Sequence, residues 1–201
     1  FYKDIVVDGT KCALNTKGNL AEDVQYASLY TGGTYRTYKD PEGIRSGYMM
    51  TKFCPLLIND WDGYLSGNIM VLSLMRLADV YLMYAEAVNE TSGPTSECVA
   101  LLNKIRSRGN LPALTPDKYA NSEAFFNAIE QERIVELATE GMRPFDIRRW
   151  RKIHDIWGEA NSDGLTLYDT NGTRIRDEFK NAPELNFQKN YIYQIPENER
   201  N

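Results

Sequence analysis

Three glutamates with four-residue spacing are the side chains of this sequence best arranged for acid–base chemistry. Glu132, Glu136 and Glu140 would lie along one face of a helix. Two carboxylates can act as acid and base in a glycosidase, and a carboxylate cluster can bind metal ions. A di-iron bundle would need Glu-x-x-His motifs on paired helices, and the single histidine, His154, has no such partner. A glycosidase remains an open alternative.

The stretch TEGMRPFDIRRW, residues 139–150, supplies positive charge next to these glutamates. Like charges four residues apart on a helix repel one another by about a few tenths of a kcal/mol, which nearby arginines would relieve. We therefore interpret the charges as a structural salt-bridge network. Replacing Arg143 or Asp146 should then lower stability, by about 3 kcal/mol for a fully desolvated partner, and change ligand affinity little. The arginines nearest in sequence are Arg133, Arg143, Arg148 and Arg149.

Other kinds of chemistry find little support. The run RRWRK, residues 148–152, resembles a nucleic-acid patch, but its flanks are acidic and the chain has a net charge of −5. No G-x-S-x-G elbow is present, and no cysteine has an obvious histidine partner. The TGG of residues 31–33 matches neither a P-loop nor a dinucleotide fingerprint. The sequences NDWDG and DTNG lack the downstream glutamate of a calcium loop. We predict no catalytic residue, metal or cofactor.

Aromatic side chains in polar loops are the remaining candidates for a binding site. They lie among Gly, Thr, Asn, Asp and Arg, outside the helical periodicity. An exposed ring can cover the apolar C–H face of a sugar while polar neighbours bind the hydroxyl groups. The alternative is that such rings pack over the helices as a satellite core. The residues that we predict to bind ligand are Tyr30, Tyr35, Arg36, Tyr38, Trp61 and Tyr64.

Helices with apolar stripes are predicted to position these loops. A first helix should run from about Ser73 to Asn89 and end at Gly93. A second should follow over 96–108, and the short link predicts an antiparallel helical pair. The residues predicted to form the apolar stripe of the first helix are Leu74, Leu77, Tyr81, Tyr84, Ala85 and Val88.

Two more helices and a hairpin complete the predicted elements. The third helix should span 122–140, with Asn121 or Ser122 as its N-cap and Gly141 as its stop. The fourth should span 144–153, with its proline in the first turn. The sequence YMMTKF, residues 48–53, could be a short strand. The pair Asn171-Gly172 predicts a tight hairpin that places Asp169 opposite Arg174.

Three long stretches carry a resemblance to a known family: MRLADVYLMYAEAVNE, LLNKIRSRGNLPAL and ERIVELATEGMRPFDIRRW. Together they resemble the SusD/RagB family of outer-membrane nutrient-binding lipoproteins. SGYMMTKF is similar to an upstream strand of the family, and NYIYQIPENER to its C-terminal strand. Pro144 stands where an aromatic residue is expected and Gln194 where proline is common, which affects local geometry only.

The resemblance implies a mainly α fold, with SusD-like helical (TPR-like) architecture, long irregular loops and small β-hairpin elements. It implies that residues 1–201 are a single unit, the C-terminal portion of a longer protein. Within that unit, residues 1–68 would be a loop-rich ligand-facing region, residues 69–158 a helical core, and residues 159–201 the hairpin and C-terminal strand.

The resemblance also implies a function. Members of the family capture glycans, or peptides in some branches, at the cell surface without catalysis, and deliver them to a TonB-dependent, SusC-like porter in the outer membrane. The implied lipid anchor is an upstream cysteine outside this sequence, and none of Cys12, Cys54 and Cys98 lies in a lipobox. The alternatives are a peptide-binding member, a carboxylate-dependent glycosidase, and a module that only docks the porter.

Overall fold

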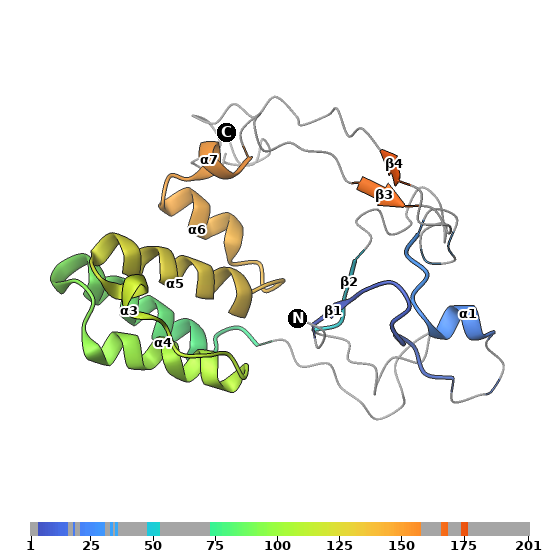
Figure 1. Cartoon of the computed structure of the whole chain (residues 1–201), viewed down its shortest axis with the longest axis horizontal. Coiled ribbons are helices and arrows are strands. Elements are labelled where there is room, and N and C mark those ends of the chain that lie inside the picture. The colour runs from blue at the N-terminus through green and yellow to red at the C-terminus, as the bar shows by residue number, and fades with distance from the viewer. Residues whose placement is uncertain are drawn as a thin grey trace, which may run out of the picture. The chain divides into compact units, whose positions relative to one another are not determined.

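The computed structural model describes residues 4–15, 18, 21–30, 33, 35, 48–52, 73–157, 166–168 and 174–176 (Figure 1). The chain divides into two compact units. One unit is Ser73–Lys152, and the other combines Phe1–Leu72 with Ile153–Asn201. Each unit has a hydrophobic core cluster of its own.

The unit Ser73–Lys152 is built from helices, which confirms the predicted mainly α fold. Helices α3 and α4 are joined by a three-residue link, 93–95, and pack against each other as the predicted pair. Helix α5 packs against both of them (Figure 1). Among the described helices, none is long and apolar enough to cross a membrane. The bounds in this unit are α3 Leu77–Ser92, α4 Ser96–Arg108, the 3-10 helix η2 Pro116–Tyr119, α5 Ser122–Glu136 and α6 Arg143–Arg149.

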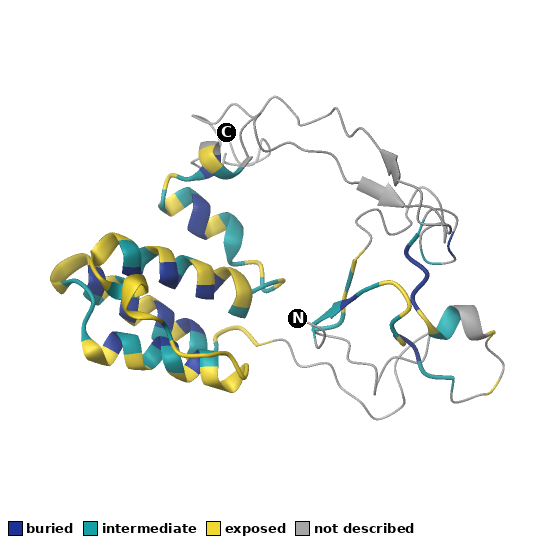
Figure 2. Cartoon of the chain, viewed as in Figure 1, coloured by how far each residue is buried: buried dark blue, intermediate teal, exposed yellow. Residues whose placement is uncertain are grey.

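The core of this unit lies between α3, α4 and α5, where the buried residues of the three helices face one another (Figure 2). Phe125 of α5 is its largest fully buried side chain. Burial of such apolar surface supplies most of the free energy that holds short helices together. The core residues are Leu82, Ala85, Cys98, Leu102, Ile105, Phe125, Ala128, Ile129 and Leu137.

The predicted apolar stripe of α3 is wrong in part. Leu74 lies before the helix and is 96% exposed, and Leu77 and Tyr84 are also exposed. The buried face begins and ends with polar residues, Asp79 and Asn89. A prediction based on the spacing of apolar residues therefore included exposed positions beside that face. The buried residues of α3 are Asp79, Leu82, Ala85 and Asn89.

The ends of α5 and α6 differ from the prediction, although the N-cap is confirmed. The Asn121 side chain accepts a hydrogen bond from the backbone N–H of Ala124 at 2.9 Å. Helix α5 ends at Glu136 rather than at residue 140, and Thr139 then adopts a left-handed φ of 67°. Arg151, with a φ of 56°, separates α6 from α7, which spans Ile153–Trp157. The fourth predicted helix is therefore shorter than expected: it ends at Arg149 rather than near residue 153, where α7 begins.

The second unit contains short strands and its own small core. Strand β1, Ile5–Val6, pairs antiparallel with β2, Met49–Met50, which confirms a strand within 48–53. Helix α1 spans Glu22–Gln25. The core consists of Val6, Cys12, Ala27 and Leu29, with Tyr35 and Met49 packed against it.

A β-hairpin forms near the predicted position but in a different register. Strand β3, Thr166–Tyr168, pairs antiparallel with β4, Arg174–Arg176. Tyr168 pairs with Arg174, so the prediction that Asp169 lies opposite Arg174 is wrong by one residue. A two-residue turn at 171–172 would pair Tyr168 with position 175, which is not the observed register. The predicted C-terminal strand, residues 190–200, lies outside the described residues.

Candidate functional site

Of the residues predicted to bind ligand, the structure describes Tyr30 and Tyr35. Their loop begins next to the small core of Val6, Cys12, Ala27 and Leu29. How the whole set is arranged stays a prediction. The other four residues, Arg36, Tyr38, Trp61 and Tyr64, lie outside the described part of the chain.

Tyr35 is half-buried, and its hydroxyl group is bound inside the unit. The hydroxyl donates a hydrogen bond to the backbone carbonyl of Val24 at 2.6 Å. It accepts one from the Cys12 thiol, with 3.2 Å between Sγ and Oη. Burial raises the pKa of the Cys12 thiol, which keeps the thiol protonated as a donor. A ligand would therefore meet Tyr35 through its ring rather than through its hydroxyl group.

Tyr30 begins a tight turn whose geometry requires glycine at its end. The Tyr30 carbonyl accepts a hydrogen bond from the N–H of Gly33 at 2.9 Å. A Cβ atom at position 33 would lie 2.4 Å from the carbonyl oxygen of Ser28, which is too close for any side chain. Just before this turn, the Asp8 carboxylate accepts a hydrogen bond from the backbone N–H of Leu29 at 2.7 Å. Two hydrogen bonds thus restrain the backbone at Leu29 and Tyr30.

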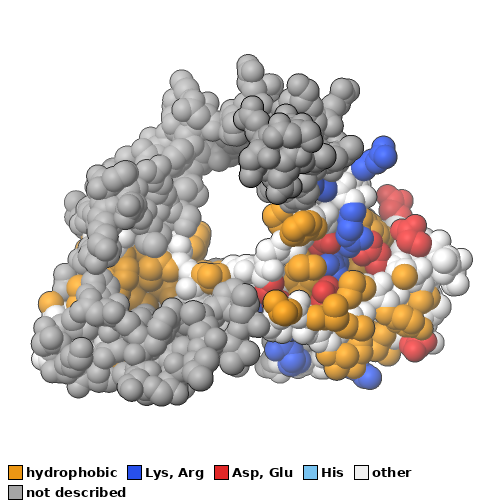
Figure 3. All heavy atoms as spheres, turned by 180° about the vertical axis from the view of Figure 1, so that it is seen from behind, with side chains coloured by type: hydrophobic (Ala, Val, Ile, Leu, Met, Phe, Trp, Pro, Cys, Tyr) orange, Lys and Arg blue, Asp and Glu red, His pale blue; other side chains and the backbone are white. Residues whose placement is uncertain are grey.

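The charged residues of the helical unit form a salt-bridge network, as interpreted from the sequence. On the face of this unit seen in Figure 3, acidic and basic side chains lie next to one another. At its centre is Arg133, whose side chain is 2% exposed. Arg133 donates to Asp79 at 2.9 Å and to Asp146 at 2.8 Å. This buried triad joins α3, α5 and α6.

The partners predicted for the glutamate stripe are wrong. Glu136 pairs with Arg76 at 2.7 Å and with Arg108 at 2.6 Å. Arg76 also pairs with Glu140 at 2.6 Å, and Glu132 pairs with Arg106. These arginines lie at the start of α3 and on α4, far away in sequence but adjacent in the fold.

The arginines that are close in sequence bind elsewhere. Arg143 pairs with Glu130 at 3.0 Å and is 31% exposed, so it is not the buried charge partner that the sequence suggested. Arg149 pairs with Glu86 and Asp146. The Arg148 side chain donates to the Pro144 carbonyl at 2.7 Å.

Trp150, the aromatic residue of the basic run, is also held within the unit. Its Nε1–H donates to Glu86 at 2.7 Å, and its ring meets Phe126 edge-on at 5.2 Å between centroids. The Arg149 guanidinium lies 4.4 Å from the ring centroid. Ring contacts and ion pairs of this kind stabilise a helix junction. They support a structural role for this stretch.

We expect the helical unit to lose stability in acid through Glu86 and Glu130. Burial raises the pKa of each, but hydrogen bonds from Arg149 and Trp150 to Glu86, and from Lys152 and Arg143 to Glu130, lower it more. Both pKa values therefore lie below that of an unfolded glutamate, about 4.3. The resulting stabilisation is complete above that pH and is lost as the pH falls through the folded-state pKa values.

The measurement is urea denaturation at several pH values. The stability difference between the native chain and Glu86→Gln or Glu130→Gln should be largest near about pH 7 and shrink toward about pH 3. Glu90→Gln, on the exposed side of α3, is the control and should show little difference at any pH. A difference that does not change with pH would contradict the assignment.

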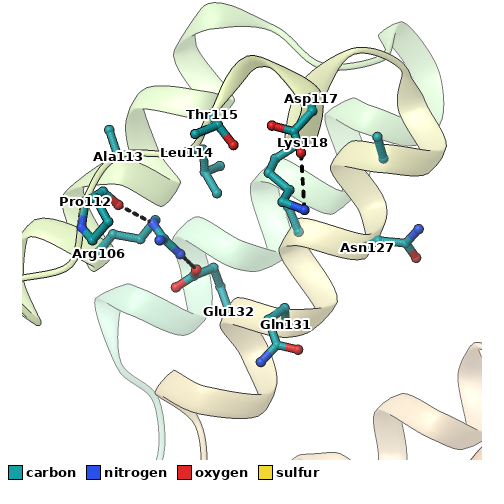
Figure 4. A pocket seen from close by; sticks show the side chains of 12 residues that line it. Arg106, Pro112, Ala113, Leu114, Thr115, Asp117, Lys118, Asn127, Gln131 and Glu132 are labelled. Atoms are coloured by element: carbon teal, nitrogen blue, oxygen red, sulfur yellow. Dashed lines mark hydrogen bonds and ion pairs between the residues drawn. The ribbon is translucent and has the colours of Figure 1, made fainter.

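A pocket of about 550 Å³ lies beside η2, between the end of α4 and α5 (Figure 4). Arg106 and Glu132 form an ion pair on one side of it, and Arg106 also donates to the Pro112 carbonyl at 2.7 Å. On the other side, Lys118 pairs with Asp117 at 3.2 Å. The volume is in the range of small-molecule sites. No feature of the sequence pointed to this pocket, because its residues come from two helices and a loop.

Metal binding has no candidate in the part of the chain that the structure covers. Among the described residues, no cluster of three or more His, Cys, Asp or Glu side chains could hold a metal ion.

Comparison with known proteins identifies one family. The family model described as "SusD family" matches residues 1–201. SusD-like protein P2 of Formosa agariphila is 34% identical over 102 residues, which cover 48% of this chain and 20% of that protein. SusD-like protein P25 of the same organism is 39% identical over 84 residues, covering 41% and 16%. The chain thus spans about a fifth or less of these relatives' length.

A solved structure supports the same relationship. The crystal structure of a SusD-like protein from Bacteroides fragilis aligns with a TM-score of 0.57 and 28% sequence identity. The alignment covers 77% of this chain and 28% of that one. The mainly helical fold is therefore shared with a known structure.

Proposed function

This chain belongs to the SusD family, and we propose that it is part of a non-enzymatic receptor that binds glycans at the cell surface. The match of the family model to residues 1–201 carries the proposal. We propose further that the receptor delivers its ligand to a TonB-dependent, SusC-like porter, and that it acts at the outer membrane through a lipid anchor outside this sequence.

We assign glycan binding to the loop region within 1–68, the part of the sequence that contains the predicted aromatic residues. Two observations support this assignment. The turn that ends at Gly33 restrains the backbone at Tyr30, and the hydrogen bonds of the Tyr35 hydroxyl group restrain the ring of Tyr35. A ring restrained in advance, such as that of Tyr35, loses little conformational entropy when a sugar stacks on it.

The ion pairs of the helical unit support binding without catalysis. Glu132, Glu136 and Glu140, the carboxylates best spaced for acid–base work, are each paired with an arginine of the same unit. The four-residue spacing of these glutamates is therefore explained by ion pairs that stabilise the helical unit. The glycosidase alternative is thereby weakened.

The test measures binding of the full-length protein to a panel of polysaccharides and peptides by affinity electrophoresis and calorimetry. Trp61→Ala should weaken binding to the best glycan about tenfold or more, because a stacked ring would be lost. Tyr35→Ala and Tyr38→Ala should also weaken it. Tyr84→Ala, which removes an exposed tyrosine of α3, is the matched control and should leave affinity unchanged.

Three results would overturn the proposal in different ways. Unchanged affinity in all three loop variants would refute the site. Release of new reducing ends from the bound glycan, lost in Glu136→Gln, would show an enzyme instead. Peptide binding without glycan binding would move the chain to the peptide-binding branch.

A further inference from the structure

The pocket beside η2 combines an apolar floor with hydrogen-bonding groups. Leu114, Ala124 and Ala128 provide apolar surface. Asn127 and Gln131, four residues apart on α5 and both exposed, add amide donors and acceptors. A few polar groups around an apolar surface are typical of small-molecule sites.

The charges of the pocket cancel, which indicates the kind of ligand. Its charged lining residues are two cations and two carboxylates. Arg106 is paired with Glu132, and Lys118 with Asp117. Hydrogen bonds from Thr115 and Lys118 also keep the pKa of Asp117 low, so this carboxylate stays ionised. An ionic ligand would have to compete with these pairs, whereas a neutral polar ligand would not.

The Arg106–Glu132 pair retains hydrogen-bonding capacity on both partners. Arg106 uses Nε for the Pro112 carbonyl and Nη1 for Oε1 of Glu132. Among the described residues, neither Nη2 of Arg106 nor Oε2 of Glu132 has a hydrogen-bond partner. A donor and an acceptor on adjacent side chains match two neighbouring hydroxyl groups, of which one accepts and the other donates.

We propose that this pocket binds one neutral sugar residue, with Arg106 and Glu132 bonding two adjacent hydroxyl groups and Ala124 and Leu114 contacting the C–H face. The inference rests on the proposed function for the class of ligand. It adds a site on the helical unit, formed by residues other than those of the aromatic loops. The sugar can be a free monosaccharide or the terminal residue of a longer glycan.

The experiment follows backbone amide signals of the 201-residue chain by NMR during titration with glucose, galactose, mannose and xylose. Oligosaccharides of the best sugar form a second arm, which separates a free monosaccharide from a chain end. We expect shifts in η2 and the first half of α5. Ala124→Phe should weaken binding about tenfold or more by filling the pocket. Asn127→Ala should weaken it about two- to tenfold, the contribution of one ordinary hydrogen bond.

The control is Ala100→Phe, which adds the same ring to an exposed position of α4 outside the pocket and should leave the titration unchanged. Both alanines have exposed or half-exposed surface, so both variants should fold. Sodium acetate and ammonium chloride test whether the pocket prefers a neutral ligand. Stronger binding of acetate or ammonium than of the sugars would refute that preference.

The remaining outcomes separate this inference from the proposed function. If the chain binds polysaccharide and Trp61→Ala abolishes binding, but no sugar shifts the pocket amides, the pocket inference fails alone. If no sugar or polysaccharide binds anywhere, both fail. Pocket shifts that persist in Trp61→Ala and vanish in Ala124→Phe would support a separate site.

Discussion

Replacing Arg133 with methionine is expected to lower the free energy of unfolding by about 3–5 kcal/mol, the usual cost of removing one partner of a buried ion pair. The guanidinium lies between Asp79 and Asp146, whose side chains are 11% and 5% exposed. Asp146 would keep Arg149 as a partner. Asp79 would keep no ion pair among the described residues, and its carboxylate would remain buried.

Urea denaturation followed by circular dichroism measures this effect. Arg108→Met is the matched control: Arg108 also binds a carboxylate of α5, but its side chain is 66% exposed. An exposed pair contributes only about 0–1 kcal/mol. Adding Asp79→Asn to Arg133→Met should restore part of the lost stability, since the unpaired charge is removed. Equal losses for the two arginine variants would show that burial of the triad is unimportant.

Phe125→Ala is expected to destabilise the helical unit by a similar amount, about 3–5 kcal/mol. Phe125 is fully buried at the centre of the core between α3, α4 and α5. Removing its ring loses apolar burial and leaves a cavity that the surrounding helices can only partly close. Phe125→Leu keeps much of the volume and should cost less than about 1.5 kcal/mol.

The neighbouring phenylalanine provides the control for this prediction. Phe126 is half-buried and contacts Trp150 edge-on at 5.2 Å. Phe126→Ala should lose chiefly that ring contact, about 0.5–1.5 kcal/mol. Thermal and urea unfolding would rank the two variants, and a larger loss for Phe126→Ala would mean that the core is centred elsewhere.

The two phenylalanines also show how far the sequence could predict the fold. Helical spacing and a glycine stop located α4 at its observed bounds, 96–108, and the structure adds that the Thr95 side chain caps the helix by accepting from the backbone N–H of Cys98. The same reasoning could not distinguish Phe125 from Phe126, since both are apolar. On α3 it was right for Ala85 but missed Asp79 and Asn89, because these buried positions hold polar residues. Their burial depends on partners supplied by α5 and its neighbours.

Sites that depend on distant contacts were beyond prediction from the sequence. The glutamate stripe was correctly interpreted as structural, yet its partners lie far away in sequence: Arg76 is 60 residues from Glu136, and Arg106 is 26 residues from Glu132. The pocket beside η2 exists only because the loop between α4 and α5 folds back beside α5. The aromatic loops, in contrast, were proposed from residue type alone, and that assignment stays a prediction.

The buried triad has a consequence for how the helical unit opens. Helix α6 has seven residues, too few to be stable in isolation. Its Asp146 is held by Arg133 of α5, and its Arg149 by Glu86 of α3. Releasing α6 would therefore leave Arg133 without one of its two carboxylates inside the core. Amide hydrogens of α6 should then exchange with solvent as part of one cooperative unit with α3 and α5, rather than by local fraying.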